Sequence, residues 1–521
     1  MEALVVRGDR IAAVGSSDDL SGRFPDAVGI DVGGRTVLPG LIDAHNHYLA
    51  TGESLDSVDV RSPGVGSIDD VVDRLKQAAR GTPSGKWISA FGLDDAKFSR
   101  PLTRADLDRA SAAHPVSVNH VSGHGCVVNS AALNTRSLGR DTPDPPGGKL
   151  GRDDAGELNG VFLDAAMQLI LPVALDIGSH GPNFHTEISL ERAVDLVEKA
   201  GSAFLQAGLT TVCDPQVSRR ELNAYREARR QERLPLRTVC MPLSHQLEEF
   251  RAVGLAGPFG DDMLSIGPMK FYADGSLIAG TAAFSEPYGE HGEFEGILLH
   301  TDEELDELLT AADLDGWQVG VHVQGDRAMT TVVDILERAI ERAPRDHRHR
   351  LEHAGYPTPE LIERIASLGV ITVNQPNFLR DSGDEFLSRL GARAHGLQPL
   401  RAELDAGITV VLSSDSDVSS YRPLETIRNA IARRTLSGEP IGADQALTLE
   451  ESLRAHTISA AYAIRMEDRL GSVEPGKLAD IAIVDGDLEG TPVEEIPSLG
   501  MWATIVGGEV RHAAEPAAFD G

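Results

Sequence analysis

The chain has 521 residues, 41% hydrophobic and 25% charged, a composition typical of globular proteins and unlike collagen-like, coiled-coil or disordered chains. Acidic side chains outnumber basic ones by 80 to 48, which gives a formal net charge of −32. This charge repels nucleic-acid phosphates and anionic membrane surfaces, so we expect no nucleic acid and no membrane among the partners. The apolar runs fall short of a membrane span and no signal-peptide pattern is found, so we expect a cytoplasmic protein.

The cysteines support the same expectation. Cys126, Cys213 and Cys240 are an odd number without a C-x-x-C spacing, and two of them lie in apolar, strand-like runs. We predict buried free thiols in a reducing cytosol.

Strand-like apolar runs occur near both ends of the chain, at residues 4–6, 11–15, 28–32, 480–484 and 503–510. Neither end has enough strands to build a core by itself. We therefore predict one small β-sandwich domain assembled from residues 1–36 and 471–521. Residues 37–470 are then one continuous domain.

The central part alternates short β-branched runs with amphipathic helical stretches, which is typical of parallel strands in βα units. The eight strand candidates are residues 37–47, 209–214, 237–242, 265–274, 318–324, 349–354, 370–375 and 408–414. Eight such units predict an α/β fold of the (β/α)8 TIM-barrel type. The long interval after the first strand has its own candidates at residues 87–92 and 116–121, and it predicts a subdomain inserted at about residues 53–200 over the barrel mouth.

Residues that bind metals well fall at the ends of these strand candidates. His45 and His47 are two positions apart on the first candidate, so their side chains share a face. His322, His353 and Asp415 end later candidates. Because the C-terminal strand ends of a TIM barrel converge, the five residues predict one metal site.

Lys270 lies inside a strand candidate that otherwise reads as buried. A buried lysine tends to lose its charge, and a neutral amine can react with carbon dioxide to give a carbamate that bridges two metal ions. The alternative is a lysine that extends to the barrel rim.

Several motifs together resemble amidohydrolase family 3, a branch of the metal-dependent amidohydrolase superfamily, over nearly the whole chain. They are P-G-L-I-D-A-H-x-H at residues 39–47, K-x-x-x-D-G-S at 270–276, H-x-x-G-D-R-A at 322–328, E-H-A at 352–354, S-D at 414–415 and the run at 471–480 that leads into the terminal domain. His124 and the N-S-A-A-L run at residues 129–133 are similar to the family's cap segment.

The resemblance implies a metal-dependent hydrolase that cleaves a non-peptide, amide-like C–N bond in a small molecule. The expected metal ligands are His45, His47, Lys270, His322, His353 and Asp415. These donors suit zinc, as one or two divalent ions, and also fit manganese or iron. A bound metal lowers the pKa of its water toward about 7, and Asp415 is expected to move the proton from that water to the departing nitrogen. His124 and Asp274 are the expected substrate-binding residues, with loop organisation as the alternative.

Two departures from the family pattern concern the start of the chain and the substrate pocket. The chain begins at Met1 where the family has an earlier strand pair, so either a truncated small domain or a misassigned start is expected. Asp417 stands where a proline is usual, which puts a second carboxylate beside the site.

Three alternatives to amide hydrolysis and one question of assembly stay open. The same site chemistry serves ester or lactone hydrolysis, and deamination of a ring. A catalytically inactive binding or regulatory relative is the alternative of another class. A homodimer is compatible with the sequence.

Overall fold

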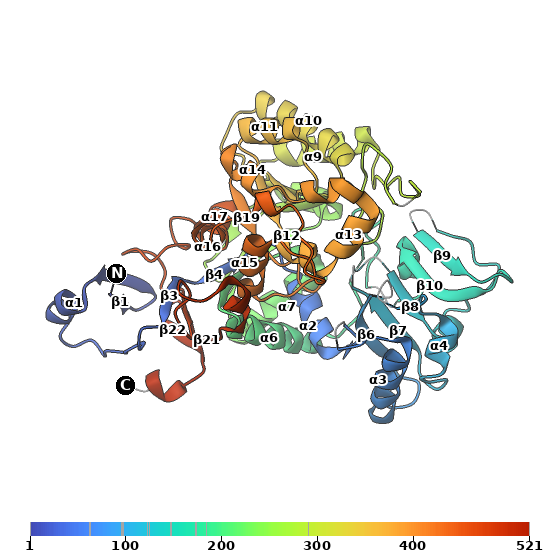
Figure 1. Cartoon of the computed structure of the whole chain (residues 1–521), viewed down its shortest axis with the longest axis horizontal. Coiled ribbons are helices and arrows are strands. Elements are labelled where there is room, and N and C mark those ends of the chain that lie inside the picture. Colours follow the sequence, from blue (N-terminus) through green and yellow to red (C-terminus); the bar gives the residue numbers. More distant parts are fainter. Residues whose placement is uncertain are drawn as a thin grey trace. The chain divides into compact units, whose positions relative to one another are not determined.

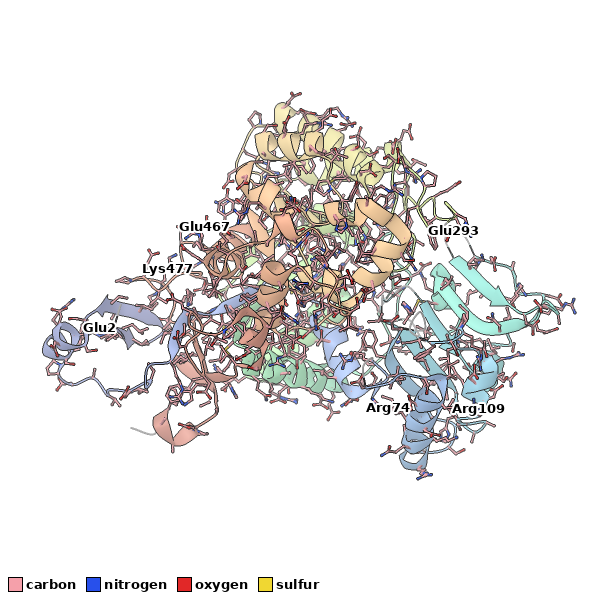
Figure 2. All side chains as sticks on the ribbon, viewed as in Figure 1. Glu2, Arg74, Arg109, Glu293, Glu467 and Lys477 are labelled. Carbon is pink, nitrogen blue, oxygen red and sulfur yellow. The ribbon has the colours of Figure 1, made fainter. Side chains whose placement is uncertain are left out.

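The computed structural model describes residues 2–519 except 62–63, 95–97, 122, 124, 146–147, 172–173, 184 and 290. The chain forms two compact units, one of residues 1–48 and 197–521 and the other of residues 49–196 (Figure 1). Ionisable residues such as Glu2, Arg109 and Glu293 are exposed, in keeping with the large net charge (Figure 2). No helix in the described ranges is both long enough and apolar enough to cross a bilayer.

One five-stranded parallel sheet lies in the larger unit and carries most of the candidate site. Its order is β15-β16-β17-β18-β19, and each strand pairs with the next in the chain. The strands are β15 (Met269–Tyr272), β16 (Val319–Val323), β17 (Arg350–His353), β18 (Ile371–Asn374) and β19 (Val410–Leu412). This order of successive parallel neighbours is that of βα units.

Alternation along these strands separates an apolar face from a polar one. Val319, Val321 and Val323 join the apolar core, while Gly320 and His322 have the opposite facing. The core lies against three helices that pack in sequence, α9 (Asp302–Leu314), α10 (Asp326–Arg342) and α11 (Pro359–Leu368) (Figure 1). The helices therefore cover one face of the sheet and leave the polar positions on the other.

A second sheet of the larger unit has the order β13-β14-β12-β11-β4. Its strands are β4 (Leu41–Asp43), β11 (Leu209–Val217), β12 (Arg237–Pro242), β14 (Leu264–Ile266) and the antiparallel β13 (Phe259–Gly260). The predicted strand 265–274 is thus divided between two sheets, which corrects that prediction. The division falls at Gly267-Pro268, where Pro268 has no N–H and a Cβ on Gly267 would lie 2.6 Å from Val239.

The predicted first strand, residues 37–47, is also divided. Thr36–Pro39 (β3) pairs with Ile481–Val484 (β20), and only Leu41–Asp43 (β4) pairs with β11. Gly40 permits the change of partner, because a Cβ there would lie 2.1 Å from the Thr210 hydroxyl oxygen.

The sheet containing β3 joins the two ends of the chain. Its order is β22-β21-β20-β3, with β21 at Met501–Val506 and β22 at Glu509–Ala513. The predicted strand-like run 503–510 spans the end of β21 and the start of β22, which form a hairpin across Gly507-Gly508, where both glycines have positive φ. Residues 28–32 form no strand, and Val28 and Ile30 are exposed. The strands β1 (Ala3–Arg7) and β2 (Arg10–Gly15) form a two-stranded sheet of their own.

The smaller unit is built on a six-stranded mixed sheet of order β5-β6-β7-β8-β10-β9. Its strands are β5 (Val58–Asp59), β6 (Ile88–Leu93), β7 (Val116–His120), β8 (Gly125–Val128), β9 (Gly148–Arg152) and β10 (Leu158–Asp164). Val71, Val72 and Leu75 of helix α3 (Ile68–Gly81) are fully buried in its core. Amphipathic packing of this helix therefore stabilises the sheet.

Further helices belong to the two units. They are α2 (Tyr48–Asp56), α6 (Leu190–Gln206), α7 (Arg219–Arg230), α8 (Leu247–Val253), α12 (Pro376–Asp381), α13 (Gly383–Leu390), α14 (Leu400–Asp405), α15 (Pro423–Ala432), α16 (Leu449–Ala455) and α17 (Ile458–Ala463).

A buried ion pair ties the terminal sheet to β12. Arg237 donates to both carboxylate oxygens of Asp480 at 2.7 and 2.8 Å, and the two side chains are 4% and 3% exposed. We expect Asp480→Asn to lower the free energy of unfolding by roughly 3–5 kcal/mol, because it leaves a buried guanidinium uncompensated. Urea unfolding measures this. Asp485→Asn is the control, since its partner Arg35 and Asp485 are 24% and 50% exposed and the expected cost is below about 1 kcal/mol. Equal costs for the two variants would contradict the prediction.

Candidate metal centre

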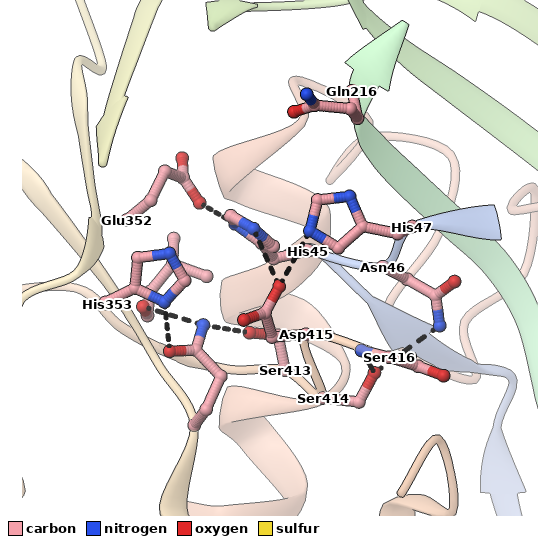
Figure 3. A network of polar contacts seen from close by, with 12 residues as sticks. His45, Asn46, His47, Gln216, Glu352, His353, Ser413, Ser414, Asp415 and Ser416 are labelled. Carbon is pink, nitrogen blue, oxygen red and sulfur yellow. Dashed lines mark hydrogen bonds and ion pairs between the residues drawn. The ribbon is translucent and has the colours of Figure 1, made fainter. Parts of the chain in front are cut away.

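Two histidines in the loop after β4 meet one carboxylate in the loop after β19. His47 Nε2 lies 2.9 Å and His45 Nε2 lies 3.3 Å from the same oxygen of Asp415, Oδ1 (Figure 3). All three side chains are buried. The side chains of the two histidines therefore point to the same place, as expected. Their orientation is set by the loop and not by the strand, because β4 ends at Asp43.

His353 at the end of β17 lies beside His45 and His322. Its ring centroid is 4.8 Å from that of His45 and 4.5 Å from that of His322. Its Nδ1 donates to the Gln375 side-chain oxygen at 2.8 Å, which leaves Nε2 with a lone pair. Burial lowers the pKa of His353 to about 3, so the imidazole is neutral at pH 7, the form that binds a metal.

The backbone is strained at two of these residues. His353 has a φ of 73° and Asp415 a φ of 53°, in the left-handed region that ordinary side chains avoid. Such conformations cost about 1–3 kcal/mol each and concentrate at functional sites.

Asp415 is ionised in this environment. Burial by itself raises the pKa of Asp415, but its close contacts with His45 and His47 and the charges of the histidines hold it well below its usual range. Burial lowers the pKa of His47, and the hydrogen bond and charge of Asp415 outweigh it, so that the pKa is raised overall. The Asp415 carboxylate and the imidazoles of His45 and His47 are thus in direct contact.

Lys270 lies on β15 with its side chain completely buried. Its Nζ has no hydrogen-bond partner among the residues that the structure describes and lies 4.5 Å from the centroid of the Tyr272 ring. Burial lowers the pKa of Lys270 to about 8. A buried amine without a partner is costly, and an interaction with a ligand would remove that cost.

His322 and Asp274 are oriented partly by backbone groups. His322 Nε2 lies 3.0 Å from the Gly275 carbonyl, to which it donates. The Asp274 carboxylate accepts hydrogen bonds from the backbone N–H groups of Ala283, Gln324 and Gly325, each at 2.9 Å, and burial raises its pKa to about 7. These bonds organise the start of α10, and the substrate-binding role of Asp274 stays a prediction. His124 lies outside the described residues.

Glu352 was noted in the sequence only as part of the E-H-A motif and Arg350 was not noted, although Glu352 contacts His45 and Arg350 binds Glu352. Glu352 Oε2 lies 2.6 Å from His45 Nδ1, and Arg350 binds both oxygens of Glu352 at 2.7 and 2.9 Å (Figure 3 shows Glu352 and His45). The sequence R-L-E-H at residues 350–353 could have indicated this pair, because Arg350 and Glu352 are alternate residues of a strand and so share a face.

The side chains that come closest together could hold one cation. Ligand atoms of His45, His353 and Asp415 all lie within 4.8 Å of one another, and His47 shares the Asp415 oxygen. Two or three imidazole nitrogens with a carboxylate are a donor set suited to zinc, manganese or iron. The Lys270 amine has no hydrogen-bond partner among the described residues, which is compatible with a ligand bound beside it.

A second buried cluster lies at the other end of β17 and consists of Asp313, His347 and His349. Val319 N–H donates to His349 Nδ1 at 3.2 Å, so the proton of this imidazole lies on Nε2, which then has no lone pair for a metal. Burial lowers the pKa of His349, so the ring is neutral. His347 Nδ1 lies 3.0 Å from both His349 Nε2 and Asp313 Oδ1. We assign this cluster to hydrogen bonding within the fold.

Comparisons with known proteins agree with the geometry. The sequence profile of the amidohydrolase family matches residues 28–512, and that of a bacterial imidazolonepropionase-like composite domain matches residues 3–27. The chain is 31% identical over 522 residues to N-substituted formamide deformylase of Arthrobacter pascens, covering 98% of this chain and 95% of that protein. It is 29% identical to the putative amidohydrolase YtcJ of Bacillus subtilis, covering 98% and 96%.

A solved structure is similar over almost the same length. It is that of an uncharacterized metal-dependent hydrolase from Pyrococcus horikoshii, with a TM-score of 0.77 and 25% sequence identity, covering 94% of this chain and 95% of that chain.

The burial of Lys270 gives a stability prediction for the metal-free protein. With the pKa at about 8 in the folded state against 10.5 unfolded, the charged amine opposes folding below pH 8, and this penalty declines from pH 8 to 10.5. We expect Lys270→Met to raise the free energy of unfolding in chelator at pH 7 by roughly 1–3 kcal/mol, with a smaller gain at pH 10.

Lys477→Met is the matched control for urea unfolding. Its amine donates to Leu470 O and to the Ser472 hydroxyl, so its loss is expected to destabilise by about 1 kcal/mol. A Lys270→Met protein less stable than wild type at pH 7 would show that the amine has a stabilising partner.

Proposed function

Because the chain belongs to the amidohydrolase family, we propose that it is a metal-dependent hydrolase of a small, amide-like substrate that cleaves a non-peptide C–N bond. The relative named N-substituted formamide deformylase supports this bond type, and the similar metal-dependent hydrolase supports the metal requirement. The observation that carries the proposal is the contact of His45 and His47 with one oxygen of Asp415 beside a neutral His353.

We propose that the parallel strands of the two sheets of the larger unit form a single (β/α)8 barrel. A bridge between Leu243 and Lys270 links β15 to the end of β12, and Asp415 N–H donates to the His45 carbonyl at 2.9 Å between the ends of β19 and β4. The TIM-barrel-like α/β fold of the family agrees with this closure. Residues 1–36 and 471–521 are then the small β domain, and residues 53–200 approximately the insertion.

The residues that would hold the metal are His45, His47, Lys270, His322, His353 and Asp415. Zinc is the ion that we propose for this donor set, with manganese or iron as alternatives. When bound, such an ion polarises a carbonyl and lowers the pKa of water toward about 7. Lys270 takes part as a carbamate in this proposal: the neutral amine nitrogen bonds to the carbon of carbon dioxide and releases a proton.

Asp415 is the proposed proton carrier. Its carboxylate is ionised, buried and oriented by His45 and His47, so it can accept a proton from the attacking water and deliver it to the departing nitrogen. His124 and Asp274 are kept as proposed substrate contacts. The buried free cysteines are compatible with a reducing compartment, and we propose the cytoplasm.

Hydrolysis of paired substrates tests this function. We expect the purified protein to release amine from N-formyl or N-acyl amines, to lose this activity in strong chelator and to regain it with zinc. Matched esters, lactones and ring amines serve as controls. Cleavage of esters alone would favour the esterase alternative, and a protein that binds metal tightly but turns over none of these compounds would favour a binding or regulatory role.

The role of Asp415 is tested against its neighbour Asp417. Asn keeps the size of Asp but has no basic carboxylate, so Asp415→Asn should lower kcat by about 100-fold to 10,000-fold while much of the metal stays bound by the histidines. Asp417→Asn should keep most of the rate. Turnover and metal content are measured for both variants. Loss of rate in Asp417→Asn but not in Asp415→Asn would assign proton transfer to Asp417.

A further inference from the structure

Glu352 is a charged side chain with no access to solvent. It is 0% exposed, as is Arg350, its partner two residues earlier on β17. The Arg350 guanidinium donates to both oxygens of Glu352, at 2.7 and 2.9 Å. The group facing His45 Nδ1 is therefore a carboxylate, which only accepts hydrogen bonds.

That contact decides where the protons of His45 lie. With the carboxylate oxygen 2.6 Å from Nδ1, the Nδ1 position carries a proton and donates it to Glu352. In a neutral ring Nε2 then has the lone pair, and this atom faces Asp415 Oδ1 at 3.3 Å. Two lone-pair atoms at that separation repel unless a cation or a second ring proton lies between them.

Arg350 fixes both the carboxylate and the backbone of the histidine loop. Its guanidinium binds both oxygens of Glu352, and its Nη2 also donates to the carbonyl of Ala44 at 2.7 Å. Ala44 directly precedes His45, so one cation holds the histidine through its side chain and through its main chain. A two-point clamp of this kind requires the planar fork of arginine.

Gly320 on the neighbouring strand β16 leaves the space that Glu352 occupies. Gly320 pairs with Arg350 in the sheet register, and a Cβ on it would lie 2.7 Å from Glu352 Oε1 and 2.4 Å from Met241 Cε. The position of the Glu352 carboxylate thus depends on β16, on β17 and on the loop after β4.

We infer that Glu352, clamped by Arg350, is a positioning residue that holds His45 in the tautomer and orientation in which Nε2 can bind a metal ion. The inference rests on the proposed metal centre and adds to it a group that touches neither metal nor substrate. Carboxylates behind a ligating histidine fix its tautomer and raise its basicity, and their loss weakens metal binding by about 10-fold to 100-fold.

The test is the zinc affinity of the full-length, metal-free chain, measured by competition with a chelator. We expect Glu352→Gln to raise the Kd for zinc by about 10-fold to 100-fold. Glu403→Gln is the matched control, because Glu403 is equally buried but accepts hydrogen bonds from Thr372 and Asn374. Its Kd is expected to stay within about threefold of wild type.

A second variant and a second measurement separate positioning from folding. Gly320→Ala displaces Glu352 without removing its charge, and it too should weaken zinc binding. Urea unfolding of each metal-free variant detects a merely structural role, which would lower stability and leave the Kd of the folded fraction unchanged. That result, or a wild-type Kd in Glu352→Gln, overturns the inference. If wild type itself binds no zinc, manganese or iron, the proposed metal centre fails instead.

Discussion

The polar face of β15, β16 and β17 holds charged side chains away from solvent. Alternation sends the apolar residues of these strands toward helices α9 to α11 and leaves Lys270, Arg350 and Glu352 completely buried on the other side. An unpaired charge in such a place costs several kcal/mol, so each must find a partner or change its protonation state. Arg350 and Glu352 pair with each other, whereas Lys270 has a lowered pKa. The chemistry of the centre therefore follows from the way a small set of charges is buried.

A second carboxylate, Asp43, brings the distant parts of the centre together. It accepts hydrogen bonds from Ser414 N–H at 3.0 Å, from the Ser414 hydroxyl at 2.6 Å and from the Asn46 amide at 2.9 Å. His47 N–H in turn donates to the Ser416 carbonyl at 2.6 Å. Hydrogen bonds thus join two loops that lie some 370 positions apart in the sequence. They explain why the loop histidines meet Asp415, although β4 and β19 have only three residues each.

Sequence reasoning could find the strands and the convergent ligand types, because both follow from local patterns. Each of the eight strand candidates overlaps an observed strand, and the residues expected at the strand ends include the His45, His47, His353 and Asp415 cluster. What it could not find depends on neighbours distant in sequence. The strand changes partner at Gly40 because the Thr210 side chain leaves no room for a Cβ there. The contact of Glu352 is with His45, which lies 307 residues earlier in the chain. The tautomer argument that separates the Asp313 cluster from the candidate centre likewise requires the position of the Val319 N–H group.

Lys270 connects this charge balance to the proposed chemistry. A shift of its pKa from 10.5 to about 8 increases the neutral fraction of the amine at pH 7 about 300-fold, and only the neutral amine reacts with carbon dioxide. The negative charge of Glu352 opposes the shift, and the positive charge of Arg350 favours it. A divalent cation held by the nearby histidines would act in the same direction as Arg350, since it disfavours a second positive charge. A carbamate formed at Lys270 would in turn attract the cation, so by linkage each would strengthen the binding of the other. The burial of one unpartnered amine is therefore a means by which the fold could make metal binding and lysine modification cooperative.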